Sequence, residues 1–126
     1  MFTDDEKDYI MRMIKEIARV LASVMLGKKY VQVELPVESK YQISGDKLHH
    51  LKTMVDQGEV NEAENELYVG MVEDDVDYLE LALTFYLYLN DMDGDFLDDN
   101  GYSREEVLDG MKELASDWGV TGLEAF

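Results

Sequence analysis

Apolar residues recur at helical spacing along most of this chain, and this rhythm restricts the fold more than any other feature. Between residues 9 and 25 they return every three to four positions, which is the period of one face of an α-helix. The same spacing resumes at residue 48 and continues to residue 115, interrupted by glycines and acidic clusters. We therefore predict an all-α chain of about five helices, the first of which is long and amphipathic.

Capping motifs support these helices. In a capping box, a cap side chain accepts a hydrogen bond from the backbone three residues later, and a Glu at that later position reaches back to the cap. A Gly after the last apolar turn often ends a helix, and Gly27 is predicted to do so for the first one. The predicted boxes are Thr3 with Glu6, Asn61 with Glu64, and Ser103 with Glu106.

The 126 residues are predicted to form a single helical domain, 1–126. Within it we expect an N-terminal helical arm at 1–29 and a helical core at 46–119. Residues 30–35 alternate apolar and polar side chains, which is typical of an extended connector or a short edge strand. Residues 36–45 contain the only Pro together with Ser and Gly, so we expect a loop there.

Two predicted helices carry wide apolar surfaces. The segment from residue 79 to residue 89 is apolar nearly all round and should lie at the centre of the core. On the first helix, the charged side chains between residues 8 and 19 cover only about 100° of arc, which predicts burial on two sides. The second cover is either the rest of the same bundle or a second copy of the chain, and both alternatives stay open.

Charge is divided very unevenly along the sequence. Residues 1–52 carry nine Lys/Arg and eight Asp/Glu, a net of +1, whereas residues 53–126 carry two Lys/Arg and twenty-one Asp/Glu, a net of −19. A surface this negative repels nucleic acid and anionic membranes and attracts cations or basic proteins. We therefore expect a basic protein as partner and no nucleic acid.

The sequence also favours a cytoplasmic protein. It contains no cysteine, which excludes disulfides and zinc–thiolate sites. Its first residues are acidic, where a secretory signal needs a basic start. The most apolar stretch, residues 10–26, contains four charged side chains, so no membrane span is expected.

The acidic run at residues 90–100 suggests a calcium site, since hard cations bind carboxylate oxygens. No register places carboxylates at the EF-hand positions together with the required Gly. A weaker site formed by Asp91, Asp93 and Asp95 stays open as a lesser alternative to a solvated acidic turn. No metal is otherwise expected.

Nothing else in the sequence indicates catalysis or a cofactor. His49 and His50 are neighbours on a helix, about 100° apart, and cannot share a metal as residues at i and i+4 can. No glycine-rich phosphate loop follows a strand, and no nucleophile elbow is present. We expect no catalytic residue, no cofactor and no enzymatic activity.

Two charged regions are candidate partner-binding surfaces. Arg12, Lys15 and Arg19 form a basic edge on the first helix, and Asp98 and Asp99 belong to the acidic half. The basic edge could dock against the acidic half within the chain or across a homodimer formed through the first helix. We expect a non-catalytic protein-interaction or scaffolding module; an acidic nucleic-acid mimic and a weak calcium-binding protein are the alternatives.

The segment from Met54 to Gly70 resembles half of a tetratricopeptide repeat. In that family a small residue closes helix A, here Gly58, and an Ala lets helix B approach closely, here Ala63. The next signature, expected about 34 residues later, is missing. The resemblance implies a helical hairpin that presents a groove.

Four segments, residues 8–14, 58–65, 85–90 and 96–110, carry a second resemblance that spans most of the chain. On these segments the chain resembles an uncharacterised family of short, acidic, helical bacterial proteins, classed as a domain of unknown function. This resemblance implies a helical cytoplasmic protein and supplies no catalytic residue.

Overall fold

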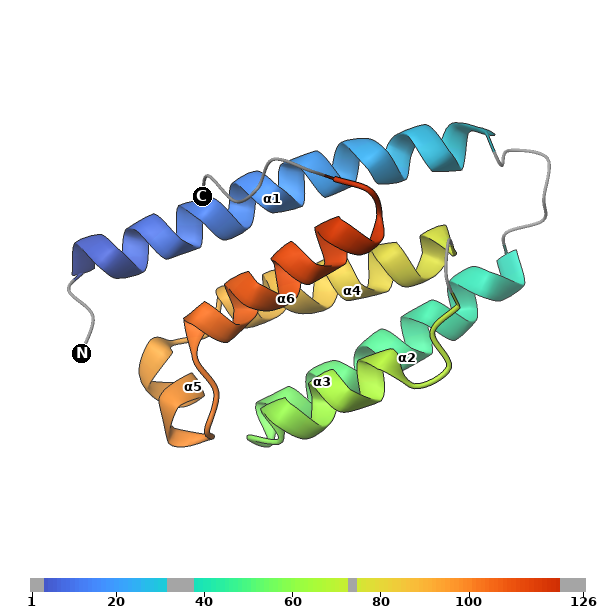
Figure 1. The fold of residues 1–126 in the computed structure, drawn as a ribbon. Coiled ribbons are helices and arrows are strands. Elements are labelled where there is room, and N and C mark those ends of the chain that lie inside the picture. The colour runs from blue at the N-terminus through green and yellow to red at the C-terminus, as the bar shows by residue number, and fades with distance from the viewer. Residues whose placement is uncertain (1–3, 32–37, 73–74, 121–126) are drawn as a thin grey trace.

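In the part of the chain that the structure describes, the fold consists of helices and the connections between them, as Figure 1 shows. The computed structural model describes the backbone of residues 4–31, 38–72 and 75–120, and the side chains of residues 7–27, 45–72 and 75–120. No strand occurs in these ranges, so the predicted all-α class is confirmed. The helices are α1 (Asp4–Val31), α2 (Glu38–Asp56), α3 (Val60–Tyr68), α4 (Val76–Asn90), α5 (Gly94–Asp99) and α6 (Arg104–Asp117).

Helix α4 is the centre of the core, as its apolar sequence predicts. It packs against α1, α2 and α6. Leu79, Phe85, Tyr86 and Leu89 are fully buried, and the rings of Phe85 and Tyr86 meet edge to face at 5.5 Å. Burying each large apolar side chain contributes about 1.5–3 kcal/mol, so this helix supplies much of the stability.

Helix α1 lies against both α4 and α6 (Figure 1). Ile14, Ile17 and Leu21 on its inner face are fully buried. Two helices of the same chain thus cover most of the wide apolar arc. Tyr9 and Val20 nevertheless remain 52% and 40% exposed, and the predicted pairing with a second copy stays a prediction.

The boundaries of the first two helices differ from the prediction. Helix α1 continues through Gly27 to Val31, so Gly27 is not a C-cap and the predicted extended segment is helical at Tyr30 and Val31. A single Gly costs a helix only about 1 kcal/mol, which packing of the long inner face offsets. Residues 32–37, with the rest of that segment, lie outside the described residues.

The predicted loop at residues 36–45 is wrong from Glu38 onward, where α2 begins. Ser39, Ser44 and Gly45 are weak helix formers but do not forbid helix, whereas a Pro inside a helix does. Ser and Gly at these positions therefore indicated a loop only weakly.

Helices α2 and α3 form the predicted hairpin. Gly58 in the turn has a φ of +89°, a conformation that favours Gly. A β-carbon there would also lie 2.4 Å from the Oδ1 atom of Asn100 at the end of α5. The turn therefore needs Gly for two reasons, and the hairpin packs close to α5.

The predicted capping boxes have different outcomes. The box of Ser103 and Glu106 is present at the start of α6. The box of Asn61 and Glu64 is wrong, because α3 begins earlier, with Glu59 as its N-cap. Asn61 instead donates to the carbonyl oxygen of Gly101 at 3.1 Å. Thr3 and the side chain of Glu6 lie outside the described residues.

Candidate functional site

Helices α5 and α6 meet at a corner that short-range hydrogen bonds hold in place. The Asp93 carboxylate caps α5 by accepting from the backbone N–H of Asp95 at 3.0 Å. At the start of α6, the Ser103 hydroxyl accepts from the N–H of Glu106 at 3.2 Å, and the Glu106 carboxylate accepts from the N–H of Ser103 at 2.8 Å. These caps fix where both helices begin.

Arg104 anchors this corner to the end of α4. Its side chain is only 7% exposed and donates to the carbonyl oxygens of Asn90 and Met92, the latter at 2.6 Å. A cation suits the carbonyl end of a helix, where the helix dipole is negative. Burial lowers the pKa of Arg104, and the nearby carboxylates of Asp93 and Asp91 oppose that effect. The positive charge of Arg104 is therefore buried against these carbonyl oxygens and does not lie on the surface.

The outer side of α5 and α6 is almost purely negative. Besides Arg104, the only basic residue between residues 53 and 126 is Lys112, which is half-buried. No fully exposed cation therefore accompanies the carboxylates in the described part of this half. The exposed acidic residues of the two helices, here called the acidic face, are Asp95, Asp98, Asp99, Glu105, Glu106, Asp109, Glu113 and Asp117.

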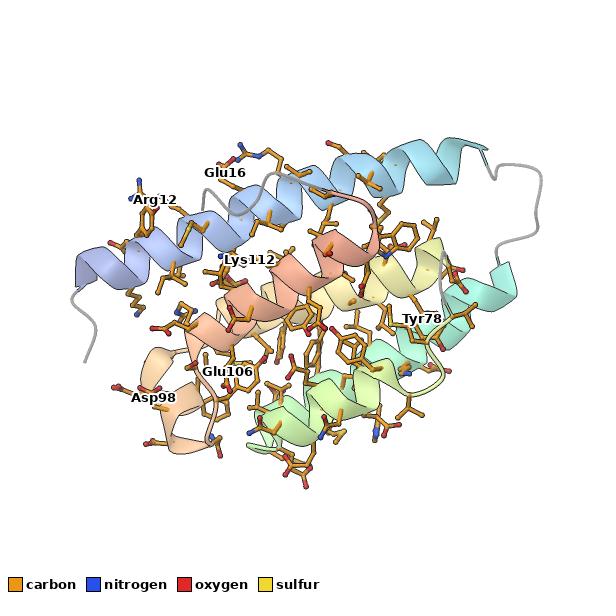
Figure 2. The ribbon with its side chains drawn as sticks, viewed as in Figure 1. Arg12, Glu16, Tyr78, Asp98, Glu106 and Lys112 are labelled. Atoms are coloured by element: carbon orange, nitrogen blue, oxygen red, sulfur yellow. The ribbon has the colours of Figure 1, made fainter. Side chains whose placement is uncertain are left out.

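The acidic face is regular along α6. Glu105, Asp109, Glu113 and Asp117 follow each other at intervals of four residues, about 6 Å apart along the helix axis. Figure 2 shows Asp98 of α5 at the same end of the molecule as Glu106, in the first turn of α6. Both predicted acidic partner-binding residues, Asp98 and Asp99, are exposed on α5, the helix that precedes α6 in the chain.

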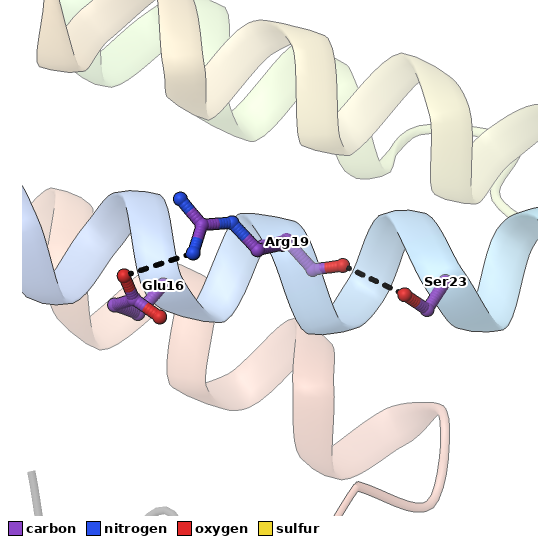
Figure 3. A network of polar contacts seen from close by, with 3 residues as sticks. All are labelled: Glu16, Arg19 and Ser23. Atoms are coloured by element: carbon purple, nitrogen blue, oxygen red, sulfur yellow. Dashed lines mark hydrogen bonds and ion pairs between the residues drawn. The ribbon is translucent and has the colours of Figure 1, made fainter.

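The predicted basic edge lies elsewhere. Arg12, Lys15 and Arg19 are exposed on α1, and Figure 2 shows Arg12 on the side of α1 that faces away from α6. Among the described residues, the only ion pair joins Arg19 to Glu16 within α1, at 3.3 Å (Figure 3). The described contacts therefore include no ion pair between the basic edge and the acidic half.

The described residues include no group of three or more His, Asp or Glu side chains that could hold a metal. Asp91, Asp93 and Asp95 are exposed around the start of α5, and the Asp93 carboxylate is occupied by the cap. His49 and His50 are exposed on α2.

A polar cluster inside the bundle was not predicted. The Oε2 atom of Glu64 accepts hydrogen bonds from the hydroxyls of Tyr86 at 2.8 Å and Tyr102 at 3.0 Å. The Tyr86 hydroxyl also lies 2.7 Å from that of Tyr68. The cluster joins α3, α4 and the α5–α6 connection, because Tyr102 precedes the capping box. The sequence feature connected with this cluster is Gly110 in α6, because the Tyr86 ring fills the space that a side chain at residue 110 would need.

The tyrosines of this cluster are held in their neutral form. Burial raises the pKa of Tyr86 and Tyr102 far above the ordinary value, and the neighbouring Glu64 raises both further. Burial likewise raises the pKa of Tyr68, against the lowering effect of its hydrogen bond with Tyr86. Neutral phenols can donate to the Glu64 carboxylate, so these hydrogen bonds tie α3 to α4 and to the connection between α5 and α6.

Comparison with protein families decides the identity of the domain. Residues 4–119 match the family described as "Family of unknown function (DUF6483)". The chain belongs to this family. The DUF6483 match begins at the first residue of α1 and ends two residues after α6. The helices α1 to α6 of the described residues, the acidic face and the tyrosine cluster are therefore parts of the DUF6483 domain.

The predicted resemblance to a domain of unknown function is thus confirmed. Comparisons with curated proteins and with solved structures found no match. The tetratricopeptide likeness of the α2–α3 hairpin stays a prediction. Within the described parts of this DUF6483 chain, no helix is both long and apolar enough to cross a bilayer.

Proposed function

We propose that this domain is a non-catalytic protein-interaction module whose acidic face docks onto a basic protein surface. The observation that carries this proposal is the exposed set of carboxylates on α5 and α6, without a fully exposed Lys or Arg among the described residues of that half. Such a face attracts a positively charged partner at long range and disfavours acidic ones.

The rigidity of the corner supports a recognition role. The Asp93 cap, the Ser103–Glu106 box and the Arg104 anchor hold α5 and α6 in one arrangement. Carboxylates on a fixed support meet a partner's cations with less ordering cost than carboxylates on a mobile loop. Arg104 supports recognition in two ways: it anchors the corner, and its burial removes a cation from the surface.

The row on α6 favours a second candidate, the mimicry of nucleic acid. Carboxylates repeated about every 6 Å along a helix can imitate a line of phosphates. The partner would then be a protein that binds DNA or RNA, and added nucleic acid would displace it from this domain. A partner that nucleic acid does not displace would leave the general interaction role.

The experiment is a pull-down from a lysate of the native host, with partners identified by mass spectrometry. Three baits are compared: the wild type, the acidic-face variant Asp98→Asn/Asp99→Asn, and the control variant Asp8→Asn/Asp46→Asn. Both variants remove two exposed carboxylates and change the net charge equally. We expect a specific partner that the wild type and the control retain and the acidic-face variant loses.

Either of two results would contradict the proposal. A partner captured equally by all three baits would assign recognition to another surface. Capture of no specific partner by the wild type would count against an interaction role altogether.

A further inference from the structure

A second surface, on α1, has features that the described residues of its own chain do not explain. Exposed residues follow one line along this helix at helical spacing. The line has an aromatic side chain at one end and small residues at the other. These residues, here called the outer stripe, are Tyr9, Glu16, Val20, Ser23 and Gly27.

Gly27 is the residue of the outer stripe that most clearly indicates contact with a second body. It lies inside α1, is exposed, and is not among the glycines with positive φ. A β-carbon at this position would meet nothing within 4 Å among the residues of the described structure. Glycine weakens a helix relative to alanine, and the described residues of the chain give no reason for it here. A second body that approaches the helix closely would give one.

Tyr9 lies at the opposite end of the outer stripe from Gly27. Its ring is 52% exposed and borders a shallow hollow that Arg12, Met13 and Glu16 also line. Large exposed aromatic side chains are typical anchors of protein interfaces. Ser23, nearer to Gly27, is a small side chain whose hydroxyl donates back to the carbonyl oxygen of Arg19 at 3.2 Å (Figure 3).

We propose that α1 pairs antiparallel with α1 of a second copy of this chain, so that the Tyr9 ring of each copy covers Gly27 of the other. An antiparallel pair centred near Ala18 also sets Glu16 opposite Val20 of the second copy. The arrangement is two-fold symmetric and self-complementary, as a homodimer interface must be. The large residue of each helix meets the smallest residue of the other.

Charge favours this face for contact between two copies. Helix α1 contains six Lys/Arg and five Asp/Glu, a net of +1, whereas the whole chain has a net charge of −18. Two copies therefore repel each other least where their α1 helices meet. Glu16 already pairs with Arg19 at the edge of the stripe, and the antiparallel arrangement brings each of these residues near its counterpart across the interface. An anionic membrane fits less well, because it would repel the acidic remainder of the chain.

Cysteine cross-linking tests the geometry, since the chain has no cysteine of its own. Tyr9→Cys and Gly27→Cys chains are purified separately, mixed in equal amounts and oxidised. We expect a disulfide-linked heterodimer from the mixture and little linkage from either variant alone. The matched control is a mixture of Asp8→Cys and Leu26→Cys, two exposed positions off the stripe, which should not link. Linkage of Tyr9→Cys to itself, or equal linkage in the control, would overturn the proposal.

Because the cysteines themselves alter the stripe, sedimentation equilibrium of cysteine-free chains provides an independent test. Gly27→Gln adds a side chain for which the described residues leave room, so we expect a more heat-stable monomer whose dimer is about tenfold weaker than the wild type. Leu26→Gln should leave dimerisation unchanged. A wild type that stays monomeric at millimolar concentration overturns the proposal. So does a monomer that binds phosphatidylserine vesicles through this stripe.

Discussion

Gly110 lies so close to Tyr86 that a β-carbon at residue 110 would be 2.5 Å from the tyrosine ring. The ring cannot easily withdraw, because Tyr86 is fully buried and its hydroxyl is hydrogen-bonded to Glu64 and Tyr68. Helix α6 can therefore lie this close to Tyr86 of α4 only because residue 110 has no side chain. The position of the acidic face depends on this contact, since α6 carries most of that face.

Gly110→Ala should accordingly destabilise the protein, although alanine is the better helix former. We expect a loss of about 1–3 kcal/mol in the free energy of unfolding, the usual cost of overpacking a core. The measurement is urea denaturation followed by circular dichroism. Gly27→Ala is the matched control, measured at a protein concentration that keeps the chain monomeric: its β-carbon meets no neighbour among the described residues, and it should stabilise the monomer by up to about 1 kcal/mol. Equal effects of the two substitutions would contradict the close contact.

Tyr86→Phe tests the hydrogen-bonded cluster separately from packing. The substitution keeps the ring but removes the hydroxyl that the Glu64 carboxylate and the Tyr68 hydroxyl share as a partner. We expect a loss of about 2 kcal/mol, because buried polar groups that lose a partner are costly. Tyr88→Phe removes the hydroxyl that donates to Asp56 near the surface and should cost less than about 1 kcal/mol. Similar losses in the two variants would show that the buried cluster contributes no more to stability than a hydrogen bond near the surface.

The same tyrosines predict how stability depends on alkaline pH. An unfolded tyrosine ionises near its ordinary pKa of 10.0, whereas burial raises the pKa of Tyr86 and Tyr102 well above that value in the fold. The folded state thus keeps these protons longer than the unfolded state. Their contribution is fully present below about pH 10 and is lost progressively as the pH rises above it.

Urea midpoints measured at pH 8 and at about pH 11 test this dependence. The wild type should lose more stability between the two values than the variant Tyr86→Phe/Tyr102→Phe, which lacks both of these phenols. A parallel decline of the two proteins would mean that general charge repulsion, and not the cluster, causes the loss.

Local signals in the sequence were enough to predict much of the fold. Helix α4 lies at the centre because its apolar residues surround it on nearly all sides. The Ser103–Glu106 box forms because both of its partners are within one helical turn. Patterns of this kind depend on neighbours in the chain, so a sequence reveals them.

Long-range partners explain what the sequence did not reveal. Glu64 resembled the end of a capping box, but its carboxylate binds Tyr86 and Tyr102, which are 22 and 38 residues away. The sequence did not single out Arg104, whose guanidinium donates to the carbonyl oxygens at the end of α4, 12 to 14 residues earlier in the chain. The extents of α1 and α2 were underestimated because packing of a long apolar face outweighs weak breakers such as Gly27.

Arg104→Ala should weaken the corner that carries the acidic face. The variant leaves the carbonyl oxygens of Asn90 and Met92 without their charged donor. We expect a loss of about 3 kcal/mol, in line with buried hydrogen bonds to a charged group. Lys112→Ala, at the only other basic residue of residues 53–126, should change stability by no more than about 1 kcal/mol. An Arg104→Ala variant as stable as the wild type would contradict the role of Arg104 as an anchor.

The most direct test of the central claim is the salt dependence of partner capture by the acidic face. The wild-type, Asp98→Asn/Asp99→Asn and Asp8→Asn/Asp46→Asn baits are compared at low and at moderate salt. Salt screens exposed charges, so a partner that docks on carboxylates binds less as salt rises. We predict that capture by the wild type and the control falls with salt, and that the acidic-face variant captures little at either concentration. Capture that is insensitive both to salt and to the loss of Asp98 and Asp99 would contradict recognition by the acidic face.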